Sequence, residues 1–269
     1  MSPSLAIFLL IFLSIFIGYI LGSIMTSDVV AFFVKKNARL HWSKNPGTTN
    51  SFRVYGKKIG IIVGFGDIFK SFIAFLISWS IYKFLLEEFI KSEVNLVEKV
   101  YYLVYLANFS SIVGHCWPIF FHFKGGKAAA PTVGFLMSTS FWWLIIISIV
   151  WIIIVIKTKY VSLASLISSA ILIFLPLINY IDYLNFFSLG QPFWIEKENY
   201  ASNLNGIGGY LTYQNDWQII LFLVLNNISI CLIIFWKHKE NIIRLINHNE
   251  NKIGSSKNEK TKKISKKKN

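Results

Sequence analysis

The chain has 269 residues, of which 54% are hydrophobic and only 15% are charged, and its mean hydropathy is +0.54. Because a water-soluble domain carries about 25% charged residues, this composition argues against a soluble fold, a disordered chain and a coiled coil. It predicts an all-α, polytopic membrane helix bundle, in which the 24 Phe and nine Trp residues suit lipid-facing and interfacial positions.

Six apolar runs predict membrane-spanning helices, because each is near or above the ~20 residues that cross the hydrocarbon core. In chain order they cover residues 5–25, 59–84, 100–121, 133–156, 161–180 and 217–236. The first run has no basic segment before it and no small-residue cleavage site after it, so it predicts a span rather than a signal peptide. Pro131, Gly134 and hydroxyl residues 138–140 interrupt the fourth region. We therefore expect residues 128–156 to form a short helix that turns back and a full helix that returns.

The distribution of the 27 Lys and Arg residues predicts the orientation of these helices. If residues 128–156 cross twice, most of the basic residues, including those in segments 35–58 and 237–269, fall on one side. The positive-inside rule assigns that side to the cytoplasm. The expected topology is seven transmembrane helices, with the N-terminus outside, the C-terminus in the cytoplasm and an external loop at residues 182–216.

The end of the chain departs from the apolar pattern. Residues 237–269 contain eleven Lys or Arg against three Glu, so we expect an integral membrane domain over residues 1–246 and a disordered basic tail over residues 247–269. Nucleic-acid binding is an alternative for such a tail, but membrane lipid is the expected partner and nucleic acid is not. Cys116 and Cys231 lie in apolar runs and predict neither a disulfide framework nor a zinc site. No metal is expected.

Four polar segments fall on the predicted cytoplasmic side. Residues 39–53 contain hydroxyl, amide, Gly and Arg side chains, although the same residue types form ordinary turns. Residues 114–127 end in Lys-Gly-Gly-Lys at the start of a helix, where free N–H groups, glycines and lysines favour phosphate. A basic tight turn would look the same. The third segment covers residues 159–165.

The fourth segment covers residues 236–244. His238 and Asn241 are three apart and share a helix face, although a solvated amphipathic helix is the alternative. Asp67 and Lys70 lie deep within a predicted span at i, i+3. Because an isolated charge there is costly, we expect the two to pair and to position the helix rather than to act in catalysis.

Three spaced motifs resemble those of the bacterial acyl-phosphate:glycerol-3-phosphate acyltransferase family (PlsY), over about residues 18–246. The first motif is matched by Arg39, Ser43, Asn45, Gly47, Thr49, Asn50 and Arg53. The second is matched by Gly114, His115, Pro118, Phe123, Lys124, Gly125, Gly126 and Lys127, and the third by His238, Lys239, Glu240, Asn241 and Ile242. Residues 160–163 resemble a family segment that contributes a serine, here Ser162.

The chain also departs from the family pattern. Trp42 and Lys44 stand where the family has Gly, and Ala128 stands where Gly follows the Lys-Gly-Gly-Lys sequence. Leu40 replaces a Glu, and Pro131 replaces a small or hydroxyl residue. With three glycines replaced, the backbone near the expected phosphate sites can adopt fewer conformations.

The resemblance implies a membrane enzyme of phospholipid synthesis in the bacterial cell membrane, with its active site on the cytoplasmic side and with no cofactor. It would transfer a fatty acyl group from acyl-phosphate to the 1-hydroxyl of sn-glycerol 3-phosphate, giving lysophosphatidic acid and phosphate. The implied catalytic residues are Ser43, Lys127, His238 and Asn241. The implied substrate-binding residues are Arg39, Asn45, Gly47, Thr49, Asn50, Arg53, His115, Lys124, Gly125, Gly126 and Ser162.

In this reading Arg53, His238 and Asn241 grip glycerol 3-phosphate, while Lys127 stabilises the departing phosphate. None of the five His residues has Asp five positions on, so a general base of the His-x-x-x-x-Asp type is excluded. Acyl chain length, oligomeric state and a contact with the enzyme that makes acyl-phosphate stay open.

A transporter or channel for a phosphorylated metabolite is the alternative function. Helices around basic pockets suit transport equally well, but transport predicts polar groups at midplane and on both faces. Here only Asp67 and Lys70 lie deep in a span. A lipid-binding scaffold anchored by the basic tail is a third, non-catalytic alternative.

Overall fold

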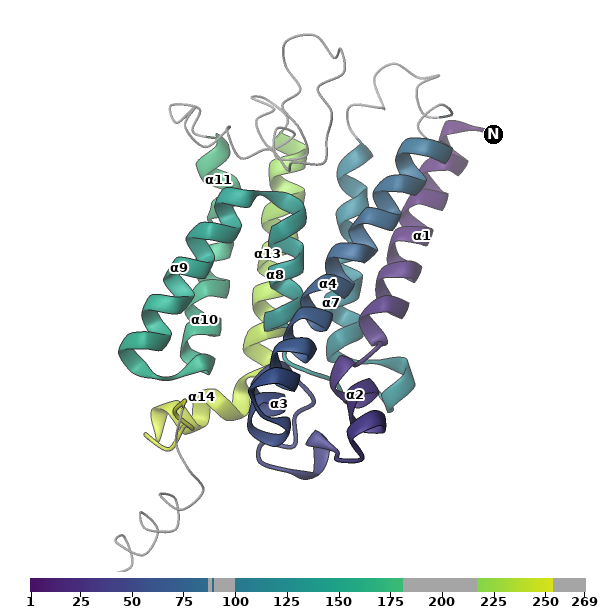
Figure 1. Ribbon diagram of the computed structural model, residues 1–269. Coiled ribbons are helices and arrows are strands. Elements are labelled where there is room, and N and C mark those ends of the chain that lie inside the picture. The colour runs from purple at the N-terminus through teal and green to yellow at the C-terminus, as the bar shows by residue number, and fades with distance from the viewer. Residues whose placement is uncertain (87–88, 90–99, 181–216, 254–269) are drawn as a thin grey trace, which may run out of the picture.

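The computed structural model describes residues 1–86, 89, 100–180 and 217–253, and every regular element within them is helical. The helices stand side by side as a bundle (Figure 1). The α-helices are α1 (Pro3–Ser23), α2 (Thr26–Val34), α3 (Thr48–Tyr55), α4 (Lys57–Ile81), α7 (Leu106–Cys116), α8 (Ala129–Thr139), α9 (Phe141–Thr158), α10 (Val161–Leu172), α11 (Leu175–Tyr180), α13 (Trp217–Lys237) and α14 (Lys239–Ile246). Short helical turns of other types are η1 (Ala38–Leu40), η2 (Tyr82–Leu86), η3 (Tyr101–Tyr105) and η4 (Ile119–Phe121).

Four helical stretches in the described ranges are long and apolar enough to cross a membrane. They are Pro3–Val34, Lys57–Leu86, Tyr102–Phe121 and Ile220–Lys237. Two shorter apolar stretches, Trp142–Thr158 and Val161–Leu177, accompany them. The all-helical, membrane-type architecture therefore agrees with the composition. The predicted external loop at residues 182–216 and most of the predicted tail lie outside the described residues.

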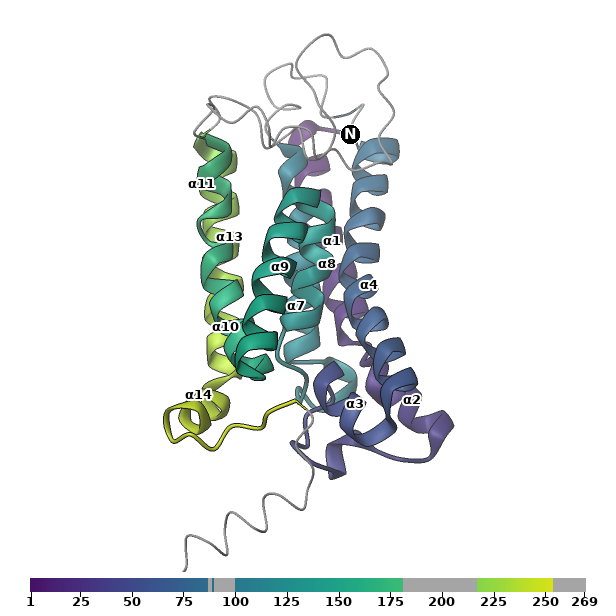
Figure 2. The ribbon, with the colours of Figure 1, turned by 60° about the vertical axis from the view of Figure 1, so that its left-hand side comes forward.

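The predicted break within residues 128–156 is confirmed. α8 ends at Thr139 and α9 begins at Phe141. Between them Ser140 is extended, with φ −156° and ψ 130°, and its hydroxyl accepts a hydrogen bond from Trp143 N at 3.5 Å as the N-cap of α9. α8 has 11 residues and rises about 16 Å, about half of the hydrocarbon thickness. The chain then returns along α9 (Figure 2).

Small residues allow the closest helix contacts of the bundle. A Cβ atom at Gly18 of α1 would overlap the backbone of Ala107 on α7, and one at Gly22 would overlap the backbone of Ser111. In the same way Gly134 of α8 lies against the backbone of Ile68 on α4. Membrane helices associate through such close backbone approach, because lipid supplies no hydrophobic drive between them.

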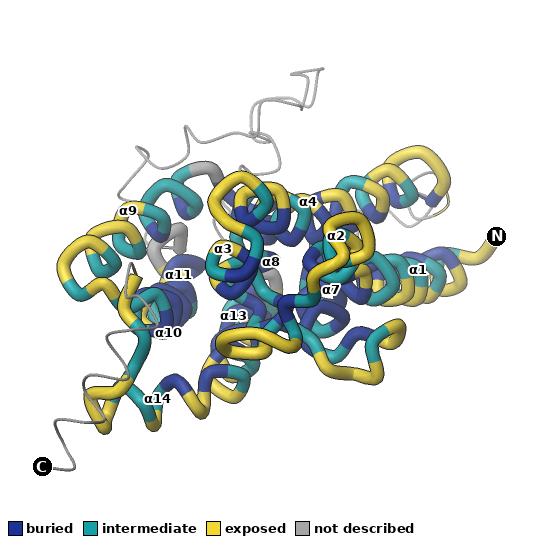
Figure 3. The backbone as a smooth tube through the Cα atoms, turned by 60° about the horizontal axis from the view of Figure 1, so that its bottom comes forward, coloured by how far each residue is buried: buried dark blue, intermediate teal, exposed yellow. Residues whose placement is uncertain are grey.

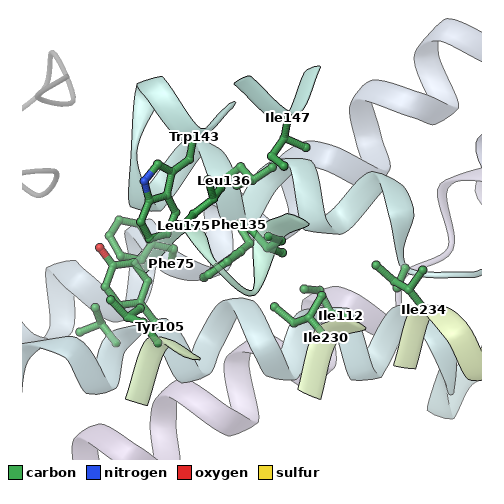
Figure 4. Close-up of a cluster of buried hydrophobic side chains, with 14 of the residues drawn as sticks. Phe75, Tyr105, Ile112, Phe135, Leu136, Trp143, Ile147, Leu175, Ile230 and Ile234 are labelled. Carbon is green, nitrogen blue, oxygen red and sulfur yellow. The ribbon is translucent and has the colours of Figure 1, made fainter. Parts of the chain in front are cut away.

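A buried aromatic and aliphatic cluster joins α4, α7, α8, α9 and α13 (Figure 4). The Tyr105 ring stacks on Phe75 with centroids 5.2 Å apart and meets Phe135 edge to face at 6.3 Å. Figure 3 shows exposed residues along the outside of α1. Many of these are large and apolar, such as Phe8 and Phe12, which are 59% and 51% exposed. An apolar exterior is what a lipid-facing surface requires.

The polar segments gather at one end of the bundle, where α2, α3 and α14 lie together (Figures 1 and 2). The folded chain continues past the expected domain boundary at residue 246. Ile253 N donates a hydrogen bond to Lys159 O at 2.9 Å, and the Lys252 ammonium lies 5.4 Å from the centre of the Tyr160 ring. Residues 247–253 are therefore packed against the turn between α9 and α10, and only residues 254–269 of the predicted tail are outside the description.

Candidate active site

A cavity of about 810 Å³ opens at this end of the bundle. Its wall is formed by α3, α4, α7, α8, α9, α10, α13 and α14 with the segments that join them. The volume lies within the range of small-molecule sites, about 300–1,000 Å³. The predicted site residues that line it are Ser43, Asn45, Gly47, Thr49, Asn50, Arg53, His115, Lys127, Ser162, His238 and Asn241. The sequence-distant clusters around Arg53, Lys127, Ser162 and His238 therefore meet at one cavity.

Four predicted site residues do not line the cavity. The Arg39 guanidinium is engaged with both oxygens of Asp28, at 2.8 and 2.5 Å, and it also donates to Lys124 O at 2.5 Å. Arg39 therefore ties the loop to α2. Lys124 is exposed outside the cavity wall. A Cβ atom at Gly125 or Gly126 would overlap His115, so these glycines allow close packing on α7.

In the segment around the start of α3, residues that line the cavity also hydrogen-bond to the backbone and stabilise its turns. Asn50 donates to Ala38 O at 2.9 Å and to His41 O at 3.2 Å, and its Oδ1 accepts from Ser43 N at 3.3 Å. Asn45 Oδ1 accepts from Gly47 N at 2.8 Å. Both amides line the cavity, but their hydrogen bonds hold the loop that presents Ser43. The turn-forming alternative thus describes part of what this motif does.

A hydrogen-bonded chain crosses the cavity wall from the Lys-Gly-Gly-Lys loop to α14. Lys127 Nζ donates to Asn241 Oδ1 at 2.5 Å, and Asn241 Nδ2 donates to Glu250 Oε1 at 2.9 Å. The other oxygen of Glu250 accepts from Arg244 Nε at 2.8 Å. Both hydrogen-bonding ends of the Asn241 amide are occupied, so Asn241 fixes the position of the Lys127 ammonium.

Glu250 is the cavity residue that sequence reasoning missed most clearly. Its side chain is only 6% exposed, although it lies in the segment expected to be a disordered tail. A turn after α14, in which Asn249 N donates to Arg244 O at 2.7 Å, brings the carboxylate back to Arg244. Neither hydrophobic periodicity nor a sequence motif predicts that turn. The Arg244–Glu250 pair forms only because the chain folds back after α14.

Burial sets the charge states of two cavity residues. Desolvation and then the positive charge of Arg244 lower the pKa of Lys127 to about 8. At neutral pH the ammonium therefore keeps its proton but releases it more readily than a surface lysine. Desolvation, followed by the charge of Lys127, lowers the pKa of His238 to about 4. His238 is therefore neutral at neutral pH.

The tautomer of His238 follows from its backbone contact. Nδ1 lies 2.8 Å from Ile234 O, and because a carbonyl only accepts, Nδ1 carries the ring hydrogen. Nε2 is then an acceptor. A neutral ring with this tautomer can accept a hydrogen bond from a hydroxyl of glycerol 3-phosphate, so the expected contact of His238 with this substrate stays a prediction.

Arg53 is the cavity cation with the most free donors. Its guanidinium lies 5.9 Å from the centre of the Trp42 ring, and it has no hydrogen bond or ion pair to another residue of the described ranges. Desolvation lowers the pKa of Arg53 from its usual value, and Glu250 opposes this shift. A guanidinium remains charged under these conditions, so Arg53 can bind an anion through two or more N–H groups.

The cavity continues between α8, α9 and α10 along an apolar wall that includes Leu136, Ile147 and Leu172. Leu136 and Ile147 lie close together in the buried cluster of Figure 4. On α10 the polar lining is limited to small hydroxyls, and the buried Ser162 Oγ has no partner within the described residues. Cationic groups at one end and an apolar wall at the other suit an amphiphilic ligand.

The positions where family glycines are replaced have left-handed backbone conformations. Trp42, Lys44 and Ala128 have φ values of 54°, 55° and 69°. Non-glycine residues adopt this region at a cost of about 1 kcal/mol. The chain therefore keeps the backbone geometry that glycine favours without the glycines.

Comparisons with known proteins agree with this geometry. Residues 12–248 match the family model described as glycerol-3-phosphate acyltransferase. The glycerol-3-phosphate acyltransferase of Mycoplasmoides gallisepticum is 47% identical over 85% of this chain and 88% of that protein. The protein of the same name from Mycoplasma pneumoniae is 44% identical over 94% of this chain and 98% of that protein.

Two solved structures are similar over most of the chain. One is the crystal structure of PlsY, an integral membrane glycerol 3-phosphate acyltransferase, in its glycerol 3-phosphate form. It has a TM-score of 0.63 and 28% identity, and the match covers 91% of this chain and 96% of that one. Its lysophosphatidic acid form has a TM-score of 0.61 and 27% identity, covering 91% and 95%.

Proposed function

This chain belongs to the glycerol-3-phosphate acyltransferase family, and we propose that it is a membrane enzyme that transfers an acyl group to glycerol 3-phosphate in phospholipid synthesis. The donor in this proposal is acyl-phosphate, the acceptor is the 1-hydroxyl of the sn-3 isomer, and the products are lysophosphatidic acid and inorganic phosphate.

The observation that carries the proposal is the meeting of cations and an apolar wall in one cavity. Arg53 and Lys127 line the same space as the apolar residues of α8, α9 and α10. Acyl-phosphate carries both a phosphate and a fatty chain, and glycerol 3-phosphate carries a second phosphate. A cavity with this composition supports binding of both substrates at the same time.

The proposed reaction needs positioning more than acid–base chemistry from the protein. Arg53 and Ser43 bind the phosphate of glycerol 3-phosphate, and His238 Nε2 accepts a hydrogen bond from the attacking 1-hydroxyl. The hydroxyl oxygen forms a bond to the acyl carbon while the bond from that carbon to the phosphate oxygen breaks. As the oxygen attacks, its hydrogen leaves the hydrogen bond to His238 Nε2 and passes as a proton to an oxygen of the departing phosphate. Lys127 stabilises the charge of that phosphate while Asn241 holds the ammonium in place.

The proposed topology has seven crossings, an external N-terminus and a cytoplasmic C-terminus in a bacterial cell membrane. α2, α3 and α14 lie at one end of the bundle, and most of the Lys and Arg residues of the sequence are in segments 35–58 and 237–269. The positive-inside rule therefore supports a cytoplasmic position for the cavity. In this arrangement glycerol 3-phosphate enters from the cytoplasm.

The test measures lysophosphatidic acid formation by purified protein from acyl-phosphate, with acyl-CoA as a parallel donor. We expect activity with acyl-phosphate, and a loss of about 100-fold or more in Lys127→Ala, the scale of removing one transition-state charge partner. Lys157→Ala, an exposed lysine outside the cavity wall on α9, serves as the matched control and should remain near the wild-type rate.

Several outcomes would change the proposal. Use of acyl-CoA alone would correct the donor while leaving acyl transfer in place. A near wild-type rate in Lys127→Ala or in His238→Ala would remove that residue from the mechanism. Uptake of glycerol 3-phosphate into proteoliposomes without product formation would favour the transporter.

A further inference from the structure

The cavity wall on α4 carries a carboxylate that the proposed reaction does not use. Asp67 lines the cavity and is 0% exposed. Its Oδ1 accepts from Thr26 Oγ1 at 3.1 Å and pairs with Lys70 Nζ at 3.2 Å, which confirms the predicted Asp67–Lys70 pair. Its Oδ2 has no hydrogen-bond partner in the described part of the chain. One oxygen is thus held by the protein, and the other is a buried acceptor at the cavity wall whose hydrogen-bonding capacity a ligand donor would satisfy.

The Lys70 ammonium cannot itself bind a ligand, because its three donors are used. They go to Ile24 O at 3.0 Å, to His115 Nδ1 at 2.9 Å and to Asp67 Oδ1. Since Nδ1 of His115 accepts this hydrogen bond, the neutral ring carries its hydrogen on Nε2. Lys70 therefore balances the charge of Asp67 and fixes the tautomer of His115.

This carboxylate is close to the loop that carries Lys127. Asp67 Oδ1 lies 3.7 Å from His115 Nδ1, and the opposite side of the His115 ring lies against Gly126, where a Cβ atom would overlap Nε2. One imidazole ring thus separates the carboxylate from the residue before Lys127. Thr48 Oγ1 lines the same cavity and is also buried without a hydrogen-bond partner among the described residues.

Asp67 Oδ2 and Thr48 Oγ1 are suited to bind a hydroxyl group of a ligand. A carboxylate oxygen accepts hydrogen bonds and repels anions, so the phosphates belong with Arg53 and Lys127 at the cationic part of the cavity. Thr48 packs against Gly64, one turn before Asp67 on α4, where a Cβ atom would lie 3.8 Å from Thr48 Oγ1. A hydroxyl at this part of the wall can therefore donate to Asp67 Oδ2 and also exchange a hydrogen bond with Thr48 Oγ1. On glycerol 3-phosphate, the 1-hydroxyl reacts and the phosphate is bound elsewhere, which leaves the 2-hydroxyl.

We propose that Asp67 binds the 2-hydroxyl of glycerol 3-phosphate and thereby makes the enzyme selective for an acceptor with neighbouring hydroxyls. This inference rests on the proposed function and adds a specificity-determining residue to it. It also gives the acceptor two anchoring points, its phosphate and its 2-hydroxyl, so that the 1-hydroxyl is directed toward the acyl carbon.

The test combines a change in the substrate with a change in the protein. Acyl transfer from acyl-phosphate is measured with glycerol 3-phosphate and with 3-hydroxypropyl phosphate, which lacks only the 2-hydroxyl. We expect the wild type to prefer glycerol 3-phosphate by about 10- to 100-fold in kcat/KM, which is the scale of one hydrogen bond to a charged group. Asp67→Asn should lower this preference to about threefold, because an amide offers only a neutral hydrogen bond.

Two further variants separate recognition from structure. Thr48→Val removes the second hydroxyl-binding group and should also reduce the preference, by about threefold. Thr26→Val is the matched control, because it removes the donor to the other carboxylate oxygen and Thr26 does not line the cavity. It should keep the wild-type preference even if the protein becomes less stable.

Each result decides the inference. Transfer by the wild type with equal efficiency on both acceptors overturns this inference but not the proposed function. A preference that is unchanged in both Asp67→Asn and Thr48→Val overturns it too, since Asp67 then has only a structural role. If Asp67→Asn does not fold, the wild-type comparison and Thr48→Val still decide. Absence of transfer by folded wild type overturns the proposed function and this inference with it.

Discussion

At the scale of single residues, the buried positions of Lys127 and His238 determine which protonation states are available for catalysis. The proposed mechanism needs a charged Lys127 and a neutral His238. The pKa of Lys127 is lowered to about 8 and that of His238 to about 4. Between these values both residues are in the required form, so ordinary cytoplasmic pH lies within the working range.

We therefore expect kcat/KM to fall as pH rises through about 8, where Lys127 loses its proton, and to fall again below about 4, where His238 gains one. A pH–rate profile of the wild type measures both limbs. Lys127→Arg keeps its charge to a much higher pH, so any activity that it retains should lack the alkaline limb. An alkaline limb that persists in Lys127→Arg would assign it to another group.

The residues with a left-handed backbone conformation, such as Lys44, allow the cost of backbone strain to be tested. Lys44 is exposed and has a φ of 55°, so Lys44→Gly should stabilise the protein by about 0.5–1 kcal/mol. Thermal unfolding in detergent measures the effect as a rise in the melting temperature. Lys58→Gly, in the helical first turn of α4, should have the opposite sign, because glycine destabilises helices. A lower melting temperature for Lys44→Gly would show that its side chain contributes more than the strain costs.

At the scale of elements, the segment after α14 forms part of the cavity wall rather than a free tail. Glu250, Asn251 and Ile253 line the cavity. A chain ending after Ile253 should keep kcat within about twofold of the wild type, with weaker membrane association. A chain ending after Asn249 loses the hydrogen bonds that Asn241 and Arg244 donate to Glu250. Each lost bond to a charged group is worth about 1.5–3 kcal/mol. Its rate should therefore fall by tenfold or more, and equal rates for the two chains would exclude a role for residues 250–253.

Some elements could be predicted from the sequence and others could not, for physical reasons. The break between α8 and α9 was predictable because Pro131 and the hydroxyl residues before Trp142 interrupt an apolar run. α3 was not predicted as a helix, because its polar sequence has no long apolar stripe and it is held by packing on α4. The resemblance to the family motifs implied that Lys127 and His238 are site residues. The ion pair of Arg39 with Asp28 could not be predicted, because it depends on how the chain folds in three dimensions.

At the scale of the whole molecule, the polar residues of the cavity lie at the end of the bundle where α2, α3 and α14 are found (Figure 1), and many exposed residues are large and apolar. The proposed topology places this polar end in the cytoplasm. The native Cys116 and Cys231 are buried, so a membrane-impermeant maleimide should report only on introduced cysteines. We expect Ser2→Cys to be labelled on intact cells and Lys44→Cys only after permeabilisation. Labelling of both under the same condition would contradict seven crossings.

The continuity between the cationic and apolar parts of the cavity has a consequence for the fate of the product. Under the proposed reaction, the newly made lysolipid has its head group beside Arg53 and its chain alongside α8, α9 and α10. That is the orientation of a lipid in the inner leaflet. The product would therefore be released by sideways diffusion into the bilayer, without exposing its chain to water, while the second product, phosphate, leaves to the aqueous side.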